Sequence, residues 1–456
     1  MLDRRNPLNK DTFPSLAVLF LGGLFSSISI FITQIILARE LSIGGFGNLM
    51  SAIAFITLMS PLALFGVSQV WLKIYGSEGR KGDRWLRVSF KLIFFSLSFT
   101  TLFLLFWAYF GPHNQSYRFF LLSLLPILLS HIFIELVNTR FQLEGKFISL
   151  AIWQNLIHFL RFFFIISFYF FISRSIEVVD VVFGYLFISL TISLIGFYFL
   201  YKMINGNFNL NLPSVNDSKE SIITSSKGLN PPSLKEIFFQ STPFGLAGLF
   251  YLIYFQSDLI FLKYLVGEQA AGIYTVSFAF LMAIYYIPGV IYQKYLLPKI
   301  HAWANFNKET LLIVFQAGNG LMLTLGLVLS LLIFFLSPLF LPLFFGYDYF
   351  ESIKVLQILA VCIPVRFLTT SIECPLYTLN FMKWKTSIMG LVAFLNIILN
   401  YLLIPSFSYI GAAIATVISE LTLLILYLVI INIKIFGKET WKGWFTGFQK
   451  SFWISS

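Results

Sequence analysis

Two arginines lie within apolar stretches of this sequence, where a charged side chain is costly and is therefore expected to serve a function. Arg161 lies near the middle of LIHFLRFFFII, with His158 one helical turn earlier on the same face, and Arg366 lies near the middle of another apolar stretch. A guanidinium stays charged and offers a planar fork of donors that suits phosphate groups. We therefore expect Arg161, His158 and Arg366 to bind an anionic substrate; the alternative is a buried ion pair or a contact between helices.

Two carboxylates also lie inside apolar stretches. Asp258 falls about one turn inside the end of YFQSDLIFLK, and Glu420 lies midway along another stretch. Either side chain could take up a proton or a sodium ion, and either could instead pair with an arginine. At the end of the first apolar stretch, Arg39 and Glu40 could form part of a gate or simply anchor the helix end.

A further pair of acids, Glu135 and Glu373, falls near the ends of two apolar stretches that occupy corresponding positions in the two halves of the chain. They could form an inner gate with Arg140 or with the basic loops around Lys146 and Lys383. The alternative is that both acids lie at the membrane interface in contact with water.

Motifs for catalysis, metal binding or nucleotide hydrolysis are missing from the sequence. It contains no GxxxxGK[ST] phosphate loop, no HExxH and no paired Cys/His spacing. Its two cysteines, Cys362 and Cys374, lie close together in or near one apolar stretch and do not form a disulfide framework. We therefore expect no cofactor, no metal and no enzymatic activity.

The elements that must position these residues are membrane helices. Apolar residues make up 58% of the 456 residues and charged residues only 11%, well below the ~25% of soluble domains. Apolar stretches of about 17–25 residues, long enough to cross a bilayer, follow one another along the chain. The sequence thus predicts an all-α polytopic membrane protein with about twelve spans, near residues 14–38, 46–68, 89–110, 119–138, 148–172, 181–200, 240–262, 271–293, 311–337, 353–374, 386–404 and 410–432.

Positive charge alternates from one connection to the next. With these spans, 24 of the 31 Lys and Arg residues lie on one side of the membrane, in the connections and termini or at the helix ends there. By the positive-inside rule this side is cytoplasmic, and both termini lie there. The same rule accounts for the net charge of +11 without nucleic acid as a partner. Residues on the external side or at external helix ends are Arg39, Arg118, Arg174, Lys263 and Lys354.

The longest connection divides the chain into two halves. Residues 205–236 are rich in Asn, Ser, Gly and Pro and lack an apolar period, which indicates a flexible cytoplasmic linker. It separates an N-terminal six-helix bundle, 1–204, from a C-terminal one, 237–433. Residues 434–456 resemble an amphipathic helix lying on the membrane, and the basic stretch from Arg80 to Lys91 also suits an anionic membrane surface.

The two halves resemble each other in sequence. ILARELSIGGFGNLMSAIAF in the first half aligns with FLKYLVGEQAAGIYTVSFAF in the second, which places Gly47 opposite Gly272 and Phe55 opposite Phe280. Six spans per half is an even number, so both halves enter the membrane in the same direction. This predicts parallel repeats around a central cavity in which the substrate binds.

These segments, together with LNIILNYLLIPSFSYIGAAIATVISE, resemble bacterial polysaccharide exporters of the lipid-linked O-unit flippase type. This family belongs to the multidrug, oligosaccharidyl-lipid and polysaccharide exporter superfamily. The resemblance runs from about residue 14 to 432. Its most specific motif comprises Asn396, Asn400, Pro405, the Gly-Ala-Ala at 411–413, and Glu420.

The resemblance implies a two-bundle fold that works by alternating access in the bacterial inner membrane. It implies that the substrate is an undecaprenyl-diphosphate-linked oligosaccharide for O-antigen or other surface polysaccharide synthesis, with membrane lipids, a polymerase and a chain-length regulator as partners. The chain lacks the two additional spans of lipid II flippases and, unlike many drug extruders, carries no carboxylate in its first span before Glu40. The alternatives are a cation-coupled multidrug or metabolite antiporter and a membrane-integral polysaccharide polymerase, which the short external loops disfavour.

Overall fold

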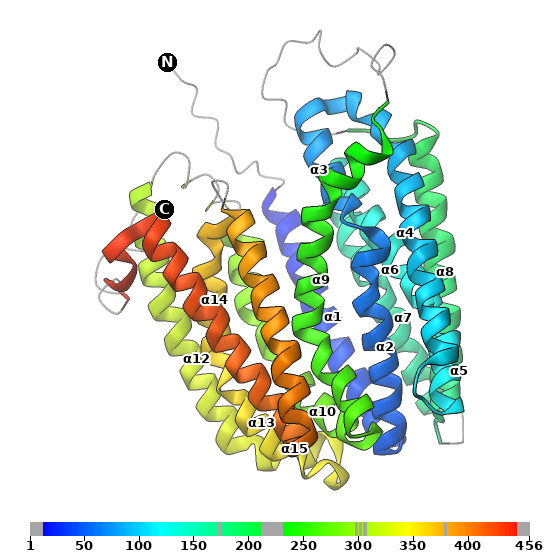
Figure 1. Ribbon diagram of the computed structural model, residues 1–456, viewed down its shortest axis with the longest axis vertical. Coiled ribbons are helices and arrows are strands. Elements are labelled where there is room, and N and C mark those ends of the chain that lie inside the picture. The colour runs from blue at the N-terminus through cyan, green and yellow to red at the C-terminus, as the bar shows by residue number, and fades with distance from the viewer. Residues whose placement is uncertain are drawn as a thin grey trace. The chain divides into compact units, whose positions relative to one another are not determined.

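The computed structural model describes residues 12–171, 175–210, 231–296, 308–377 and 381–444, together with Ile300 and Trp303. Within these ranges every regular element is a helix, and no strand occurs (Figure 1). The prediction of an all-α polytopic membrane protein is confirmed. Most of the predicted linker and the predicted tail beyond Trp444 lie outside the described residues.

The first half of the chain contains the elements α1 (Thr12–Glu40), α2 (Ile43–Leu64), α3 (Val67–Glu78), η1 (Gly79–Gly82), α4 (Asp83–Phe110), α5 (Gln115–Ser123), α6 (Pro126–Leu143), α7 (Phe147–Phe171) and α8 (Val178–Ile204). The second half contains α9 (Leu234–Leu265), α10 (Glu268–Gly289), η2 (Val290–Leu296), α12 (Lys308–Phe345), η3 (Tyr347–Tyr349), α13 (Ser352–Ala360), α14 (Cys362–Glu373), η4 (Cys374–Tyr377), α15 (Met382–Ile431), η5 (Asn432–Phe436) and η6 (Gly437–Trp441).

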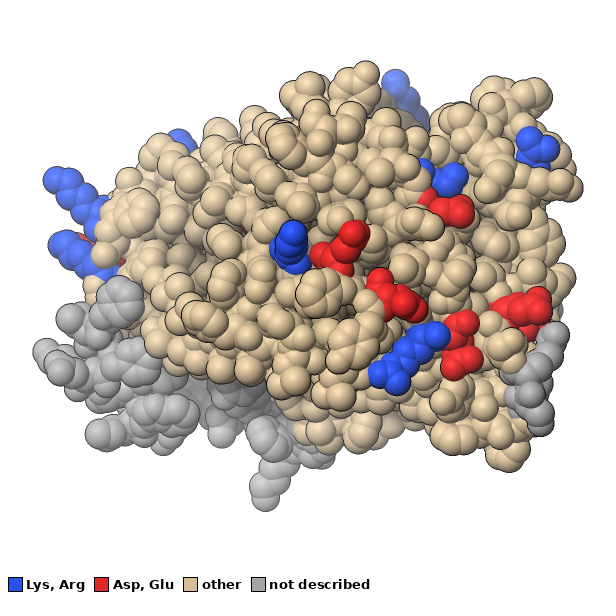
Figure 2. All heavy atoms as spheres, turned by 90° about the horizontal axis from the view of Figure 1, so that it is seen from below, with Lys and Arg blue, Asp and Glu red and all other residues tan. Residues whose placement is uncertain are grey.

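Ten segments of the described chain are long and apolar enough to cross a membrane. Two of them, Ile43–Phe110 with 68 residues and Met382–Trp441 with 60, are far longer than one crossing needs. The exact number of twelve spans therefore stays a prediction. Large apolar side chains are exposed along these helices, as expected where lipid replaces water, for example Phe110, Phe171 and Phe187. Figure 2 shows the face seen from below, where a few acidic side chains lie next to basic ones among mostly uncharged residues.

By its contacts, the chain forms two compact units. The N-terminal unit comprises the residues up to Thr33 and Ala52–Leu249, and the C-terminal unit comprises Gln34–Ser51 and the residues from Phe250 onward. Helices α1, α2 and α9 each contribute residues to both units. In the N-terminal unit α6 packs against α7 and α8, and in the C-terminal unit α14 packs against α12 and α15.

Proline interrupts the fourth predicted span of each half in the same way. The first is divided into α5 and α6, and α6 begins at Pro126; the second is divided into α13 and α14 near Pro364. Proline lacks the N–H that a continuous helix requires, so the helix restarts at these points. Pro126 and Pro364 are separated by as many residues as Glu135 and Glu373 are, which agrees with the internal repeat.

The long helix α15 contains a sharp break. Ser408 has φ 54° and ψ −136°, which separates two helical segments close to the predicted boundary between residues 404 and 410. Gly411 follows it, at a position where a Cβ would overlap the carbonyl oxygen of Leu403. The sequence motif that includes Pro405 and Gly411 therefore forms this turn. Its glycine allows the two helical segments to approach each other.

The two glycines that the repeat aligns, Gly47 and Gly272, lie where α2 and α10 come into closest contact within the C-terminal unit. A Cβ on Gly47 would overlap the carbonyl oxygen of Glu268 and lie 2.6 Å from the amide nitrogen of Gly272. A Cβ on Gly272 would in turn overlap the carbonyl oxygen of Ile43. Small residues that let backbones approach are the usual device of helix packing in membranes.

We therefore expect Gly47→Ala to destabilise the protein. Overpacking costs about 1–3 kcal/mol, which should lower the thermal midpoint of the detergent-solubilised protein by several degrees. Gly289→Ala is the matched control, because Gly289 also lies in a helix but a Cβ added there would meet nothing within 4 Å. Equal midpoints for Gly47→Ala and Gly289→Ala would show that the close approach is not needed.

Candidate functional site

Asp258 is fully buried in α9 and accepts hydrogen bonds from four uncharged side chains. The Tyr274 hydroxyl donates to its Oδ2 over 2.7 Å, and the Thr416 hydroxyl donates to the same oxygen. Asn396 and Asn400 donate to its Oδ1 over 3.3 and 2.5 Å. No arginine or lysine among the described residues pairs with Asp258, so the alternative that it forms an ion pair is not what the structure shows.

A second layer of polar groups holds these partners in place. Ser257 donates to Asn396 Oδ1 over 2.6 Å, and Asn400 donates to the same oxygen over 3.0 Å. Within the described residues Asn400 Oδ1 is buried without a hydrogen-bond partner. The cluster thus gathers hydroxyl and amide groups from α9, α10 and α15 around one carboxylate, and all four contacts are donated to Asp258, which suits its charged form.

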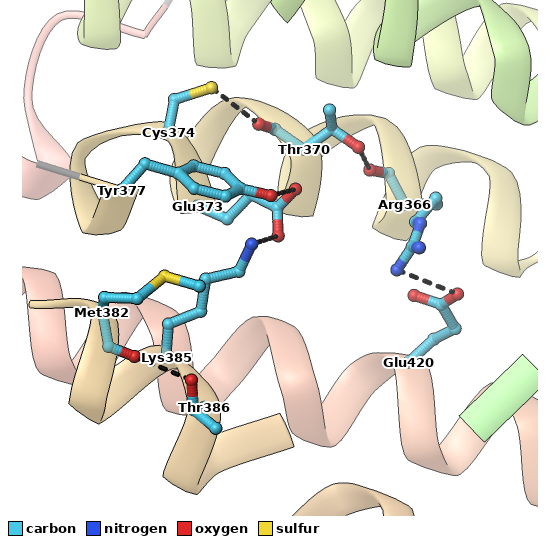
Figure 3. A network of polar contacts seen from close by, with 9 residues as sticks. All are labelled: Arg366, Thr370, Glu373, Cys374, Tyr377, Met382, Lys385, Thr386 and Glu420. Carbon is cyan, nitrogen blue, oxygen red and sulfur yellow. Dashed lines mark hydrogen bonds and ion pairs between the residues drawn. The ribbon is translucent and has the colours of Figure 1, made fainter. Parts of the chain in front are cut away.

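Arg366 of α14 and Glu420 of α15 form an ion pair in the C-terminal unit (Figure 3). Their Nη1 and Oε1 atoms are 3.7 Å apart, and Tyr285 donates to the same carboxylate oxygen over 3.5 Å. The guanidinium also lies over aromatic rings, 4.7 Å from the centroid of Phe255 and 5.5 Å from that of Tyr285. The pair is long for a charge-assisted hydrogen bond, so Arg366 keeps donor capacity for another acceptor.

A second ion pair lies beside it (Figure 3). Lys385 of α15 contacts Glu373 of α14, with Nζ and Oε2 3.2 Å apart, and Tyr377 donates to Glu373 over 3.5 Å. The predicted spans place Lys385 in a cytoplasmic loop with Lys383, yet its side chain is buried inside the unit. It is buried because Glu373 neutralises it and the centroid of the Tyr377 ring lies 3.4 Å from its Nζ.

Arg366 and the pair of Glu373 with Lys385 line one cavity. Its empty volume is about 440 Å³, including the part that opens to the outside. Three buried oxygens of this region, Glu420 Oε2 and the hydroxyls of Tyr254 and Tyr427, have no hydrogen-bond partner among the described residues. Such groups call for water or a polar ligand. The lining comprises Tyr251, Tyr254, Phe255, Arg366, Glu373, Tyr377, Lys385, Met389, Val392, Leu423 and Tyr427.

Arg161 occupies a different environment in the N-terminal unit. It projects from α7 over the ring of Tyr185 on α8, 4.4 Å from the ring centroid. Its Nε and Nη2 atoms are buried without a hydrogen-bond partner in the described part of the chain. His158 and His131 lie close enough to interact electrostatically with it. The prediction from sequence paired Arg161 with His158 but missed His131 and Tyr185, which come from other helices.

The predicted gate residues have different surroundings. Arg39 donates to the backbone carbonyls of Leu343 and Phe344 at the end of α12, which is the contact of a helix anchor. Arg140 is not a partner of Glu135: its Nε donates to Glu144 over 2.9 Å. Glu135 itself is exposed on α6. In this structure the guanidinium of Arg140 is paired with Glu144, one turn further along the chain, and the inner gate stays a prediction.

Comparison with known proteins shows the family and the fold of the chain. The sequence profile of the family described as "Polysaccharide biosynthesis protein" matches residues 14–301. No curated protein sequence matches the chain. The solved structure of the lipid II flippase MurJ in an inward closed conformation is similar, with a TM-score of 0.64 and 15% identity over 95% of this chain and 91% of that one.

Two further solved structures share the fold. An inward-facing multidrug resistance MATE family transporter of the MOP superfamily has a TM-score of 0.62 and 14% identity over 90% of this chain and 95% of that one. A MOP superfamily transporter from Pyrococcus furiosus has a TM-score of 0.57 and 13% identity over 92% of this chain and 95% of that one. At these identities the likeness establishes the fold of such transporters.

Proposed function

Since the chain belongs to the polysaccharide biosynthesis protein family and has the fold of MurJ and MATE transporters, we propose that it is a flippase. Its substrate is an undecaprenyl-diphosphate-linked oligosaccharide repeat unit, which it moves from the cytoplasmic to the outer leaflet of the bacterial plasma membrane. The moved unit then serves O-antigen or another surface polysaccharide, whose polymerase and chain-length regulator are expected partners. Transport requires no catalysis by the chain itself.

The observation that carries this proposal is the environment of Arg161. Two buried nitrogens of its guanidinium have no acceptor among the described residues, and burial of such a charge is costly unless an anion is supplied. A diphosphate offers several charged oxygens that match the guanidinium fork. With His158 and His131 beside it, Arg161 provides an anion-binding group in the N-terminal unit.

Arg366 is the corresponding group of the C-terminal unit. Its contact with Glu420 is 3.7 Å long, so a phosphate or an acidic sugar could bind Arg366 more closely than Glu420 does. Glu420 then acts as a placeholder that neutralises Arg366 between transport events. The aromatic rings around Arg366 suit the apolar faces of sugar rings, and the unsatisfied hydroxyls of Tyr254 and Tyr427 suit sugar hydroxyl groups.

Asp258 is the candidate coupling residue. Its partners are neutral, so binding or release of a proton or sodium ion changes the net charge of this cluster. A change of charge inside the membrane gives an ion gradient a direct effect on the conformational equilibrium. Glu420 and Glu373 already have basic partners and are weaker candidates for this role.

The proposed orientation has both termini in the cytoplasm. Reporter fusions after Phe208 and Gly437 should then report the cytoplasm, and fusions after His113 and Gly346 should report the exterior. This is the pattern that the distribution of Lys and Arg predicts. The same compartment for Phe208 and His113 would overturn the orientation and the parallel repeat that depends on it.

A second candidate function is cation-coupled antiport of drugs or small metabolites, which the similarity to MATE transporters favours. The two functions make opposite predictions for purified protein in vesicles. An antiporter expels cationic dyes when a gradient is imposed and leaves lipid-linked oligosaccharides in place. A flippase moves the lipid-linked oligosaccharide and ignores the dyes.

A further inference from the structure

A basic groove lies in the N-terminal unit, away from the candidate site. It is formed by the start of α4, the end of α8 and the start of α9, whose ends come together at the same end of the unit (Figure 1). Its empty volume is about 1490 Å³, including the part open to the outside. The lining residues, which we call the α4 groove, are Asp83, Arg84, Leu86, Arg87, Val88, Lys91, Met203, Ile204, Gly206, Pro231, Pro232 and Leu234.

The charges of the α4 groove favour an anion. Arg84 is paired with Glu78, their Nη2 and Oε2 atoms 3.1 Å apart, and Asp83 accepts a hydrogen bond from the hydroxyl of Tyr75 over 2.7 Å. Arg87 and Lys91 are exposed, and no ion pair is found for either among the described residues. These two side chains therefore leave uncompensated positive charge in the groove.

Two helices also begin at the α4 groove. Helix α4 starts at Asp83 and α9 at Leu234, and the first turn of each carries its own carboxylate, Asp83 in α4 and Glu236 in α9. At α9, the Ser233 hydroxyl accepts from the Glu236 amide and the Glu236 carboxylate accepts from the Ser233 amide, so these two amides already have partners. Arg87 and Lys91 are therefore the groups in the α4 groove that match a phosphate.

The apolar face of α4 identifies the kind of molecule that carries this phosphate. Below Lys91, one stripe of the same helix face carries Phe95, Phe99 and Leu102, at spacings of three and four residues. These side chains are 58%, 71% and 65% exposed, as side chains in contact with lipid chains are. A charged groove that continues into an exposed apolar stripe on one helix matches the headgroup and the acyl chains of one lipid.

We propose that the α4 groove is a binding site for an anionic phospholipid of the surrounding membrane. Arg87 and Lys91 bind its phosphate, and the acyl chains lie along Phe95, Phe99 and Leu102. The lipid thereby connects α4, α8 and α9 at their ends. The proposal is independent of the flippase function, since its ligand is a membrane lipid and its residues lie outside the candidate site.

The test measures lipid binding to the full chain in detergent by native mass spectrometry. The wild type is titrated with phosphatidylglycerol, with zwitterionic phosphatidylcholine and with inorganic phosphate as a competitor. We expect phosphatidylglycerol to bind in preference to phosphatidylcholine and to resist competition by an equal concentration of phosphate. The double variant Arg87→Gln/Lys91→Gln should lose at least about tenfold in apparent affinity for phosphatidylglycerol.

The matched control is Lys73→Gln/Lys308→Gln, which removes two exposed lysines outside the α4 groove and should bind like the wild type. Both variants change exposed side chains, and gel filtration checks that each remains monodisperse. Wild-type affinity in Arg87→Gln/Lys91→Gln would overturn the site. Equal binding of phosphatidylcholine would overturn its preference for anionic lipid, and displacement by equimolar phosphate would overturn its assignment to a lipid.

Discussion

Replacement of Arg161 by alanine should reduce the rate of lipid-linked oligosaccharide translocation by about tenfold to a hundredfold, the value of one charge-assisted hydrogen bond. The protein should still insert and accumulate, because no acidic partner of Arg161 occurs among the described residues that the substitution would leave unpaired. Arg161→Lys should restore part of the rate, since the charge remains but the bidentate fork is lost. The measurement is translocation in proteoliposomes at equal protein content.

Arg366 needs a different design, because its removal leaves Glu420 buried and unpaired. We therefore expect Arg366→Ala to lose both activity and abundance, and Arg366→Ala/Glu420→Gln to recover abundance without activity. Arg118→Ala is the control for both sites, since Arg118 bonds to the backbone carbonyl of Ala108 over 3.1 Å and lies outside the cavity. Normal translocation by Arg161→Ala and by the double variant would place the diphosphate elsewhere.

Asp258→Asn should abolish the response of translocation to an ion gradient while leaving slow downhill flipping. The amide has nearly the same shape as the carboxylate and still accepts hydrogen bonds through its one oxygen. It carries no charge, so it cannot bind and release a proton or a sodium ion as the carboxylate does. Translocation is measured with a proton gradient, with a sodium gradient and with neither. The gradient that accelerates the wild type identifies the coupling ion.

The control for Asp258→Asn is Asp348→Asn, which removes an exposed carboxylate from η3 of the same unit. It should respond to the gradient as the wild type does. A purely structural Asp258 would give a different result: Asp258→Asn would accumulate poorly because four donors lose their charged acceptor, and the remaining protein would keep the gradient response of the wild type.

The sequence predicts the fold of this protein well because membrane helices follow from local composition. Each span needs only an apolar stretch of sufficient length, and the break in α15 at Ser408 lies close to the boundary that hydropathy indicates. What hydropathy misses are breaks inside an apolar stretch. The interruptions before Pro126 and near Pro364 leave hydropathy unchanged, and only the missing proline N–H indicates them.

The sequence predicts part of the candidate site, because the only signal available is a charged residue inside an apolar stretch. Charge inside an apolar stretch marks Arg161, Arg366 and Asp258 without any knowledge of the structure. It does not mark Lys385, because this residue follows the start of a helix and looks like a loop lysine until Glu373 is seen beside it. Nor does it mark His131 or Tyr185, because the contacts between helices decide their roles.

The central claim is that this chain moves an anionic lipid-linked oligosaccharide across the membrane. It is tested most directly with purified protein in vesicles that contain a fluorescent undecaprenyl-diphosphate oligosaccharide, with an impermeant quencher outside. We predict that the wild type exposes the inner-leaflet lipid to the quencher far faster than protein-free vesicles and faster than Arg161→Ala. Translocation no faster than in protein-free vesicles, with efflux of a cationic dye by the same preparation, would contradict the flippase assignment and favour an antiporter.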